Sequence, residues 1–191
     1  YSPEATVTLT ITAINDAPIA TGDSLSIDED SGAYSGTLNG TDVDNDTLSF
    51  SIDTGPTKGT VEINDALSGA YAYTPNTNEN GADSFIFVVS DGSVDSSATL
   101  TINIQPLNDA PVGTASTFSI DEDSGTYTGT LSGTDVENDT LTFSLVSTAS
   151  KGSVELSDSS SGAFTYTPNA DEHGADSFGF EVNDGELDSA T

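Results

Sequence analysis

Residues 40–48 read Gly-Thr-Asp-Val-Asp-Asn-Asp-Thr-Leu, and residues 133–141 repeat this stretch with one change, a Glu in place of the second Asp. The stretches Asn-Asp-Ala-Pro (residues 15–18) and Ile-Asp-Glu-Asp-Ser-Gly (residues 27–32) also recur 93 residues later. Solenoid units usually span about 20 to 50 residues, so a repeat of this length is a whole domain. The acidic motifs occur in both copies, which indicates a structural role at each domain junction rather than a unique active site.

Apolar and polar residues alternate with a period of two through most of the chain, as they do in half-buried β-strands. Residues 7–11, for example, alternate Val, Leu and Ile with Thr. Residues 85–89 are apolar throughout, but their copy at 178–182 reads Phe-Gly-Phe-Glu-Val. We therefore expect the two phenylalanines and Val89 of this stretch to face a core, because successive side chains of a strand point to opposite faces.

Turn-forming dipeptides separate the alternating stretches at short intervals. In the first copy they are Asn39-Gly40, Lys58-Gly59, Ser68-Gly69, Asn80-Gly81 and Asp91-Gly92. The pattern predicts an all-β fold of tandem Ig-like antiparallel β-sandwiches, with about seven short strands in each. The Cys…Trp…Cys core of antibody domains is absent, so the resemblance to immunoglobulins concerns architecture alone.

The repeat pattern also predicts the domain boundaries. Residues 15–107 form the first repeat, and residues 108–191 form a second repeat that lacks its own last strand. Residues 1–14 correspond to the last strand of a preceding repeat. A strand with an unpaired edge tends to find a partner, so residues 5–14 are expected to pair with a preceding repeat or, as a donor strand, with the incomplete second repeat of another molecule. A frayed terminus is the alternative.

The composition is strongly acidic, with 32 Asp and Glu residues against 2 Lys and Arg residues and a formal net charge of -30. Proteins recognise nucleic acids and anionic membranes through clusters of Lys and Arg, so neither is expected as a partner. Self-repulsion of the carboxylates calls for salt, bound cations or an extended shape. A solubility surface from a high-salt organism is an alternative explanation, and it is compatible with cation binding.

Catalytic motifs are not found. His173 is the single histidine, and its counterpart in the first copy is Asn80, which argues against a catalytic triad or a zinc site of several histidines. There is no Cys for thiol chemistry or disulfides. Carboxylates in duplicated, solvated turns are also the wrong setting for glycoside hydrolysis, which needs one pair in a cleft. We expect a protein that is not an enzyme.

The acidic turn at residues 42–46 reads Asp-Val-Asp-Asn-Asp, which has the spacing at which an EF-hand loop begins. An EF-hand requires Gly next and a later Glu, between two helices. Thr47 follows here, and the next residues have a strand pattern. A cation site assembled from several segments at the ends of a sandwich fits better, because Ca²⁺ takes six to eight oxygen ligands. Plain turn formation by Asp side chains is the alternative.

The order of the motifs resembles that of the cadherin repeat, and more closely that of the bacterial cadherin-like repeats of large surface adhesins. Those repeats carry a Lys-Gly or His-Gly turn, Tyr-Thr-Pro-Asn, Gly-x-Asp-Ser-Phe, Asp-Gly and then Asn-Asp-Ala-Pro. This chain has the motifs in the same order at residues 58–59, 73–76, 81–85, 91–92 and 108–111. The resemblance covers essentially the whole chain, and it implies Ca²⁺ held between consecutive repeats.

The resemblance also implies the ligands of that Ca²⁺. At the junction of the two repeats they would be Glu29, then Asn108 and Asp109 of the linker, then Asp135, Glu137 and Asp184. At the N-terminal edge of the first repeat they would be Asn15, Asp16, Asp42, Asp44 and Asp91, and Glu122 is the second copy of Glu29. Pro106 and Ala110 stand where the cadherin linker has Asp and Asn, so fewer ions are expected at each junction than in cadherins.

The function expected from this resemblance is that of Ca²⁺-rigidified stalk repeats of an extracellular adhesin on a bacterial surface, with neighbouring repeats as partners. One alternative is a carbohydrate- or cell-surface-binding module that uses Tyr71, Tyr73 and Tyr166, although alternation places these rings mainly in the core. The other alternative is an extracellular filament whose identical subunits are joined through the strand at residues 5–14.

Overall fold

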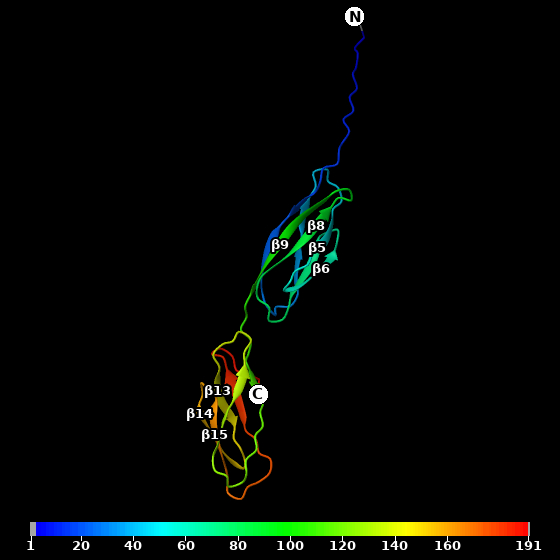
Figure 1. Cartoon of the computed structure of the whole chain (residues 1–191). Helices are drawn as coiled ribbons and strands as arrows, with labels where there is room; N and C mark the ends of the chain where they lie inside the picture. Colours follow the sequence, from blue (N-terminus) through cyan, green and yellow to red (C-terminus); the bar gives the residue numbers. More distant parts are fainter. Residues whose placement is uncertain (1–2, 191) are drawn as a thin grey trace. The chain divides into compact units, whose positions relative to one another are not determined.

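The computed structural model describes residues 3–190, and the regular elements within them are β-strands. The chain divides into two compact units, Tyr1–Leu107 and Asn108–Thr191. Each unit has its own set of β-strands (Figure 1). The sheets of each unit pack around a separate apolar core. The predicted all-β, Ig-like sandwich architecture is therefore confirmed. In the described part of the chain, no helix has the length and apolar character needed to cross a membrane.

The first unit is built from three sheets. One has the strand order β2-β9-β8-β5, the second has the order β3-β7-β6, and the third pairs β1 with β4. The strands are β1 (Ile19–Thr21), β2 (Asp23–Asp28), β3 (Tyr34–Thr37), β4 (Asn39–Thr41), β5 (Ser49–Thr54), β6 (Gly59–Asp65), β7 (Ala70–Pro75), β8 (Gly81–Ser90) and β9 (Asp95–Gln105).

Strands β8 and β9 form the longest hairpin of the first unit. Their antiparallel register runs from Gly81 opposite Ile104 to Ser90 opposite Asp95. Phe85, Phe87 and Val89 of β8 are buried, which confirms the orientation predicted from the comparison of the two copies.

Strand β9 is central to its sheet because it has a partner on each side. It pairs in parallel with β2 and antiparallel with β8. Its buried residues are Leu100, Ile102 and Ile104, and the residues between them are exposed. β9 therefore supplies both a row of apolar side chains to the core and the hydrogen bonds that hold β2 in place.

A buried carboxylate connects two of the sequence motifs. Asp83 accepts hydrogen bonds from the backbone N–H groups of Thr57 (2.9 Å) and Lys58 (3.0 Å) and from the hydroxyl of Tyr73 (2.8 Å). The Tyr of Tyr-Thr-Pro-Asn and the Asp of Gly-x-Asp-Ser-Phe thus brace the turn that precedes β6. The same arrangement recurs around Asp176 in the second unit.

The second unit follows the same plan with fewer paired strands. Its sheets are β11-β15-β14, β13-β16 and β10-β12. The strands are β10 (Val112–Thr114), β11 (Tyr127–Thr130), β12 (Ser132–Thr134), β13 (Thr142–Ser147), β14 (Gly152–Asp158), β15 (Ala163–Pro168) and β16 (Gly179–Asn183). The buried core residues are Leu131, Phe143, Phe164, Tyr166 and Val182.

The two units differ at the position that β9 occupies in the first unit. Within residues 108–190, only the start of a corresponding segment is present, where Asp188 bridges to Asn183 and the N–H of Ser189 donates to the carbonyl of Val182 (2.7 Å). Residues 116–121, the copy of β2, are not in a strand, and neither are residues 174–178, the copy of the first half of β8.

Residues 3–14 lie outside every strand and are exposed along their whole length. Val7, Leu9 and Ile11 are 93%, 80% and 87% exposed. The strand predicted for residues 5–14 has no pairing partner among the described residues.

We predict that Tyr73→Phe lowers the unfolding free energy of the first unit by about 1 to 2 kcal/mol, because it removes one donor from a buried carboxylate. Tyr166→Phe is the matched change in the second unit, where the hydroxyl donates to Asp176. Denaturant unfolding measures both effects. A Tyr73→Phe protein as stable as the parent would contradict the bracing role.

The same carboxylate predicts a pH dependence. Burial by itself raises the pKa of Asp83, but the hydrogen bonds from Thr57, Tyr73 and their neighbours outweigh it and lower the pKa. In the unfolded chain the pKa of an Asp side chain is about 3.9. Above about pH 3.9, ionised Asp83 therefore contributes to the stability of the folded state. This contribution is lost as the pH falls through the lower pKa of Asp83 in the folded state.

We therefore expect the difference in Tm between the parent and Asp83→Asn to be constant from about pH 5 to 7 and to shrink below about pH 4. Thermal melts followed by circular dichroism across this range test the expectation, and a difference that does not change with pH would refute it.

Candidate metal centre

The acidic turn after β4 is organised by the side chain of Asp42. Its Oδ1 atom accepts hydrogen bonds from the backbone N–H groups of Asp44 (2.8 Å) and Asp46 (3.3 Å). Asn45 between them has a φ of 60°, a left-handed conformation that Asn tolerates better than most residues. One carboxylate oxygen therefore holds the turn, while the Oδ2 atom of Asp42 is buried and has no hydrogen-bond partner.

The segment that leads into the first unit is tied to this turn and to the β8–β9 turn. The side-chain amide of Asn15 donates to Oδ2 of Asp91 (2.8 Å), and the backbone N–H of Asp16 donates to Oδ2 of Asp44 (2.8 Å). Five residues predicted from the resemblance, Asn15, Asp16, Asp42, Asp44 and Asp91, are thus brought together at one end of this unit.

Asp91 is held as an ionised carboxylate. The hydrogen bond from Asn15, together with those from the N–H groups of Val94 and Ser93, lowers the pKa of Asp91. Its Oδ1 atom accepts both backbone bonds (2.7 and 2.6 Å), which leaves Oδ2 directed toward Asn15.

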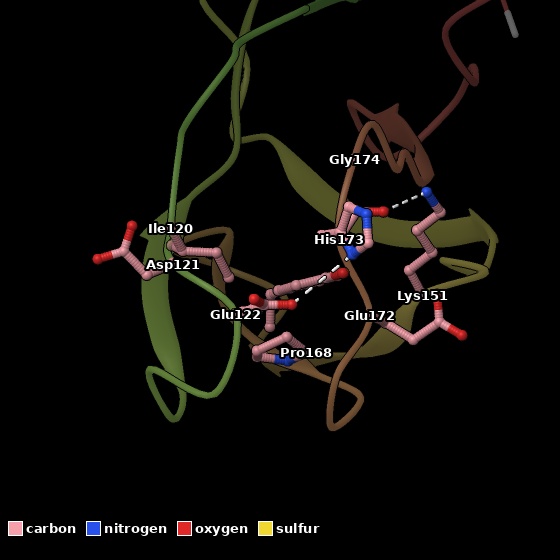
Figure 2. Close-up of a pocket in the computed structure, with 9 residues that line it drawn as sticks. Ile120, Asp121, Glu122, Lys151, Pro168, Glu172, His173 and Gly174 are labelled. Carbon is pink, nitrogen blue, oxygen red and sulfur yellow. Dashed lines mark hydrogen bonds and ion pairs between the residues drawn. The ribbon is translucent and has the colours of Figure 1, made fainter.

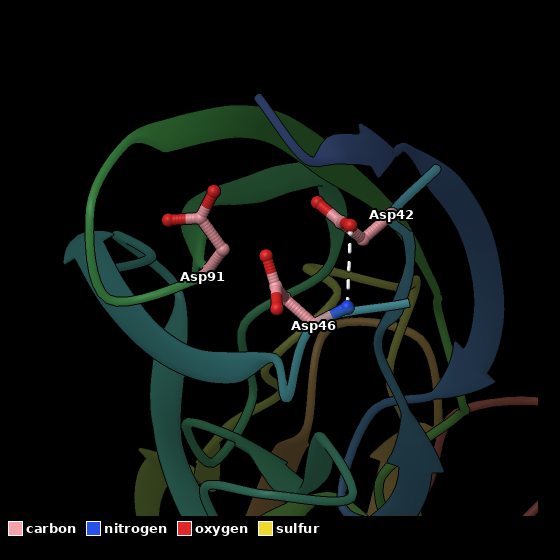
Figure 3. Close-up of side chains that lie close together, drawn as sticks. All are labelled: Asp42, Asp46 and Asp91. Atoms are coloured by element: carbon pink, nitrogen blue, oxygen red, sulfur yellow. Dashed lines mark hydrogen bonds between the residues drawn. The ribbon is translucent and has the colours of Figure 1, made fainter. Parts of the chain in front are cut away.

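Carboxylate oxygens of Asp42, Asp46 and Asp91 all lie within 4.8 Å of one another (Figure 3). Three anionic groups at this separation repel one another unless a cation lies among them. Asp46 is a residue that the sequence analysis left out of the site. Its copy, Asp139, occurs at the same position of the repeated stretch, so the repeat contained the signal.

The second unit reproduces this arrangement at the corresponding end. The side-chain amide of Asn108 donates to Oδ2 of Asp184 (2.9 Å), and the backbone N–H of Asp109 donates to Oε2 of Glu137 (3.2 Å). Asp135 accepts the N–H of Asp139 (2.9 Å) through Oδ1, and its own Oδ2 is buried with no partner.

The hydrogen bonds to Asp184 match those to Asp91. The N–H groups of Leu187 and Glu186, followed by the amide of Asn108, lower the pKa of Asp184. The two edges therefore have the same chemistry, and each offers ionised oxygen ligands at neutral pH.

Glu29 lies at the opposite end of the first unit and is completely buried. Its Oε1 atom accepts the backbone N–H of Leu107 (2.9 Å) and the side-chain amide of Asn80 (3.2 Å), while Oε2 is buried without a partner. Leu107 directly precedes Asn108, so the carboxylate of Glu29 lies beside the segment that leads into the linker.

Glu122, the copy of Glu29, has a different environment. It is exposed, and its Oε2 atom lies 3.7 Å from Nδ1 of His173 (Figure 2). No residue in the described part of the second unit provides the backbone N–H that Leu107 provides to Glu29. The structure thus leaves this predicted ligand outside a formed site.

Neither lysine neutralises Glu29 or the carboxylates at the two unit edges. The ammonium groups of Lys58 and Lys151, which are the Lys and Arg residues of the chain, donate instead to the backbone carbonyls of Asn80 and His173. Buried carboxylate oxygens without a donor are costly unless a cation pairs with them. The donor set is entirely oxygen, which suits Ca²⁺ rather than a transition metal.

The fold and these acidic edges define a class of protein, tandem β-sandwich repeats with a cluster of carboxylates at the end of each unit. The sequence profile of the bacterial cadherin-like domain matches residues 15–106 and again residues 108–191. The chain therefore belongs to the bacterial cadherin-like domain family. This membership points to an extracellular, adhesin-type repeat, as the sequence motifs predicted.

Solved cadherin ectodomains have the same fold. The first two domains of human protocadherin-24 match with a TM-score of 0.58 at 15% identity, over 88% of this chain and 87% of that one. Domains 1–4 of Drosophila N-cadherin match with a TM-score of 0.57 at 16% identity, over 92% of this chain and 47% of that one. No curated protein matches the chain significantly.

An endo-fucoidan hydrolase of glycoside hydrolase family 107 is also similar, at 22% identity and a TM-score of 0.44, over 94% of this chain. This chain spans only 28% of the length of that hydrolase. The similarity carries no argument about catalysis.

We predict that Asp42→Asn weakens Ca²⁺ binding about tenfold at the acidic cluster of the first unit. Asp135→Asn should have the same effect at the acidic cluster of the second unit. Asn retains an oxygen for the N–H groups of the turn, so each change removes mainly the buried charge. Isothermal titration with CaCl₂ measures the effect, and Glu62→Gln, on the exposed face of β6, is the charge-matched control. Equal affinities in all four proteins would show that the acidic turns serve only as turns.

Proposed function

We propose that this chain is a pair of extender repeats from a bacterial extracellular adhesin, and that Ca²⁺ stiffens the connection between consecutive repeats. The observation that carries the proposal is the set of buried carboxylate oxygens without partners on Glu29, Asp42 and Asp135. All three belong to residues that the resemblance implied as ligands. Each is held in place by a hydrogen bond to its other oxygen, so a cation needs little rearrangement to bind.

At the linker, the proposed ligands are Glu29 from the first repeat, Asn108 and Asp109, and then Asp135, Glu137 and Asp184 from the second. Support comes from each unit separately. Glu29 contacts the N–H of Leu107, and Asn108 and Asp109 contact Asp184 and Glu137. A shared cation would attract carboxylates that otherwise repel one another, and it would thereby restrict the linker.

The proposed role is non-catalytic. His173 and its partner Glu122 are both exposed, so neither has the buried, hydrogen-bonded environment of a catalytic pair. The three tyrosines considered for glycan binding, Tyr71, Tyr73 and Tyr166, are buried in the two cores. A glycan-binding role through these rings is therefore not part of the proposal.

The expected energy per site is modest. Extracellular Ca²⁺ modules bind with dissociation constants of about 10⁻⁴ to 10⁻³ M. At about 1 mM Ca²⁺, mass action then adds about 0.4 to 1.4 kcal/mol of stability per site. Such a site stiffens a linker while remaining reversible by chelation.

We expect Ca²⁺ at about 2 mM to raise the Tm of the chain relative to EDTA and to narrow the distribution of sizes in small-angle X-ray scattering. Glu29→Gln should reduce the effect on scattering, because it removes the ligand that the first repeat contributes beside the linker. Glu122→Gln is the matched control, since the same residue in the second repeat is exposed. Scattering profiles that are identical with Ca²⁺ and with EDTA would contradict the proposal.

A further inference from the structure

The turn between β7 and β8 is tied to the rest of the first unit at three points. The backbone N–H of Asn76 donates to the carbonyl of Lys58 (2.8 Å), and the ammonium group of Lys58 donates to the carbonyl of Asn80. The N–H of Asn78, which has a φ of 57°, donates to Oδ1 of Asp30 (3.3 Å). The backbone around Asn80 is therefore held in place, and this limits where its side chain can reach.

The side chain of Asn80 is directed at Glu29. Its Nδ2 atom donates to Oε1 of Glu29 (3.2 Å), and the same oxygen accepts the backbone N–H of Leu107 (2.9 Å). The backbone N–H of Glu29 in turn donates to the carbonyl of Gln105 (2.9 Å). Three segments that are far apart in the sequence thus meet at one carboxylate: the turn after β2, the turn before β8 and the segment that leads into the linker.

Glu29 depends on these two donors because it is completely buried. An ionised carboxylate without hydrogen bonds is costly in such a place, and the charge-assisted hydrogen bonds that it accepts are stronger than those between neutral groups. The N–H of Leu107 moves with the segment that leads into the linker, whereas Nδ2 of Asn80 belongs to a turn that is held in place. Asn80 is therefore the donor that can keep the carboxylate in position when the linker moves.

The frame of this turn recurs in the second unit. The N–H of Asn169 donates to the carbonyl of Lys151 (2.9 Å), and the ammonium group of Lys151 donates to the carbonyl of His173 (2.6 Å). His173 occupies the position of Asn80, and its Nδ1 atom lies 3.7 Å from Oε2 of Glu122. Both turns thus place a nitrogen-bearing side chain beside the glutamate of the Asp-Glu-Asp motif.

We propose that Asn80 is a positioning residue for Glu29. Its amide holds the carboxylate against the N–H of Leu107, so that the first repeat retains the start of the linker before any cation binds. The hydrogen bonds at Oε1 also keep Oε2, which is buried without a partner, in a defined place for a cation. The role toward Ca²⁺ rests on the proposed function, whereas the retention of the linker does not.

Linker retention and cation binding both depend on this one carboxylate. A ligand that is already held in its bound position loses less conformational entropy when the cation arrives, so it contributes more to the affinity. Without the amide of Asn80, each opening of the Leu107 hydrogen bond removes the last of the two donors at Oε1. The carboxylate of Glu29 then turns toward water, and the closed state is less favoured.

Hydrogen exchange in EDTA, followed residue by residue by NMR, tests the retention of the linker without any cation. We expect the amide of Leu107 to exchange at least about tenfold faster in Asn80→Ala than in the parent, because the opening equilibrium loses a hydrogen bond to a charged group. The amides of the β8–β9 ladder should exchange as in the parent. Asn64→Ala, on the exposed face of β6, is the matched control and should leave Leu107 unchanged.

A conservative variant separates positioning from a general structural role. Asn80→His keeps a side-chain N–H and introduces the residue that the second copy carries. At about pH 8, where an unperturbed His is neutral, it should restore the protection of Leu107 to within about threefold of the parent. Asn80→Asp has nearly the shape of Asn but replaces the donor with a second carboxylate, so Leu107 should exchange at least as fast as in Asn80→Ala.

Isothermal titration with CaCl₂ tests the role toward the cation. It is carried out in proteins that also contain Asp42→Asn, which weakens the cluster at the other end of the first unit. Asn80→Ala should lower the affinity of the linker site about tenfold, the size of effect that partners of metal ligands typically have. Asn64→Ala should leave that affinity unchanged.

The proposal is overturned if Leu107 exchanges at the same rate in Asn80→Ala and in the parent. It is equally overturned if faster exchange extends over the whole β8–β9 ladder, or if Asn80→His does not reduce it, because Asn80 would then only support the fold. A parent that binds no Ca²⁺ at the linker, with Leu107 still exchanging faster in Asn80→Ala, would contradict the proposed function while supporting the retention of the linker by Asn80.

Discussion

The double pairing of one central strand is the constraint on which the first unit depends. β9 is hydrogen-bonded to β2 on one side and to β8 on the other, and it supplies three buried aliphatic side chains to the core. The end of the same strand leads to Leu107, whose N–H positions Glu29. Core, sheet and acidic site are thus connected through a single segment. In the second unit, where residues 108–190 provide only the start of this segment, the copies of β2 and of the first half of β8 are not strands and Glu122 is exposed.

The carboxylates divide into two groups that differ in what they contact. Asp83 and Asp176 are satisfied by backbone N–H groups and a tyrosine hydroxyl, and they hold a turn against the core. The carboxylates at the unit edges use one oxygen to shape a turn, and Asp42 and Asp135 keep the other buried without a donor. The first group needs no ligand. The second group concentrates negative charge where neither lysine reaches, and this makes a divalent cation a fitting partner.

Comparison of the two copies predicted features that one copy alone leaves open. The copy of residues 85–89 contains Gly and Glu at alternate positions, and this identified Phe85, Phe87 and Val89 as the core face. The motif order predicted which acidic turns would converge, and Asn15, Asp44 and Asp91 lie together as expected. The cadherin turn motif ends at the second Asp of the turn and so does not include Asp46, although the side chain of Asp46 completes the cluster.

The sequence by itself determined the all-β architecture, the repeat length and the family, because these follow from local alternation, turn residues and motif order. Only the tertiary structure decided which oxygen of each carboxylate is used by a turn and which is left for a cation, since that depends on backbone N–H groups from distant segments. It also decided that Glu29 and Glu122, identical in local sequence, differ in burial. The physical reason is that the environment of Glu29 is set by β9, a strand far away in sequence, whereas the described residues 108–190 include only the start of the corresponding segment beside Glu122.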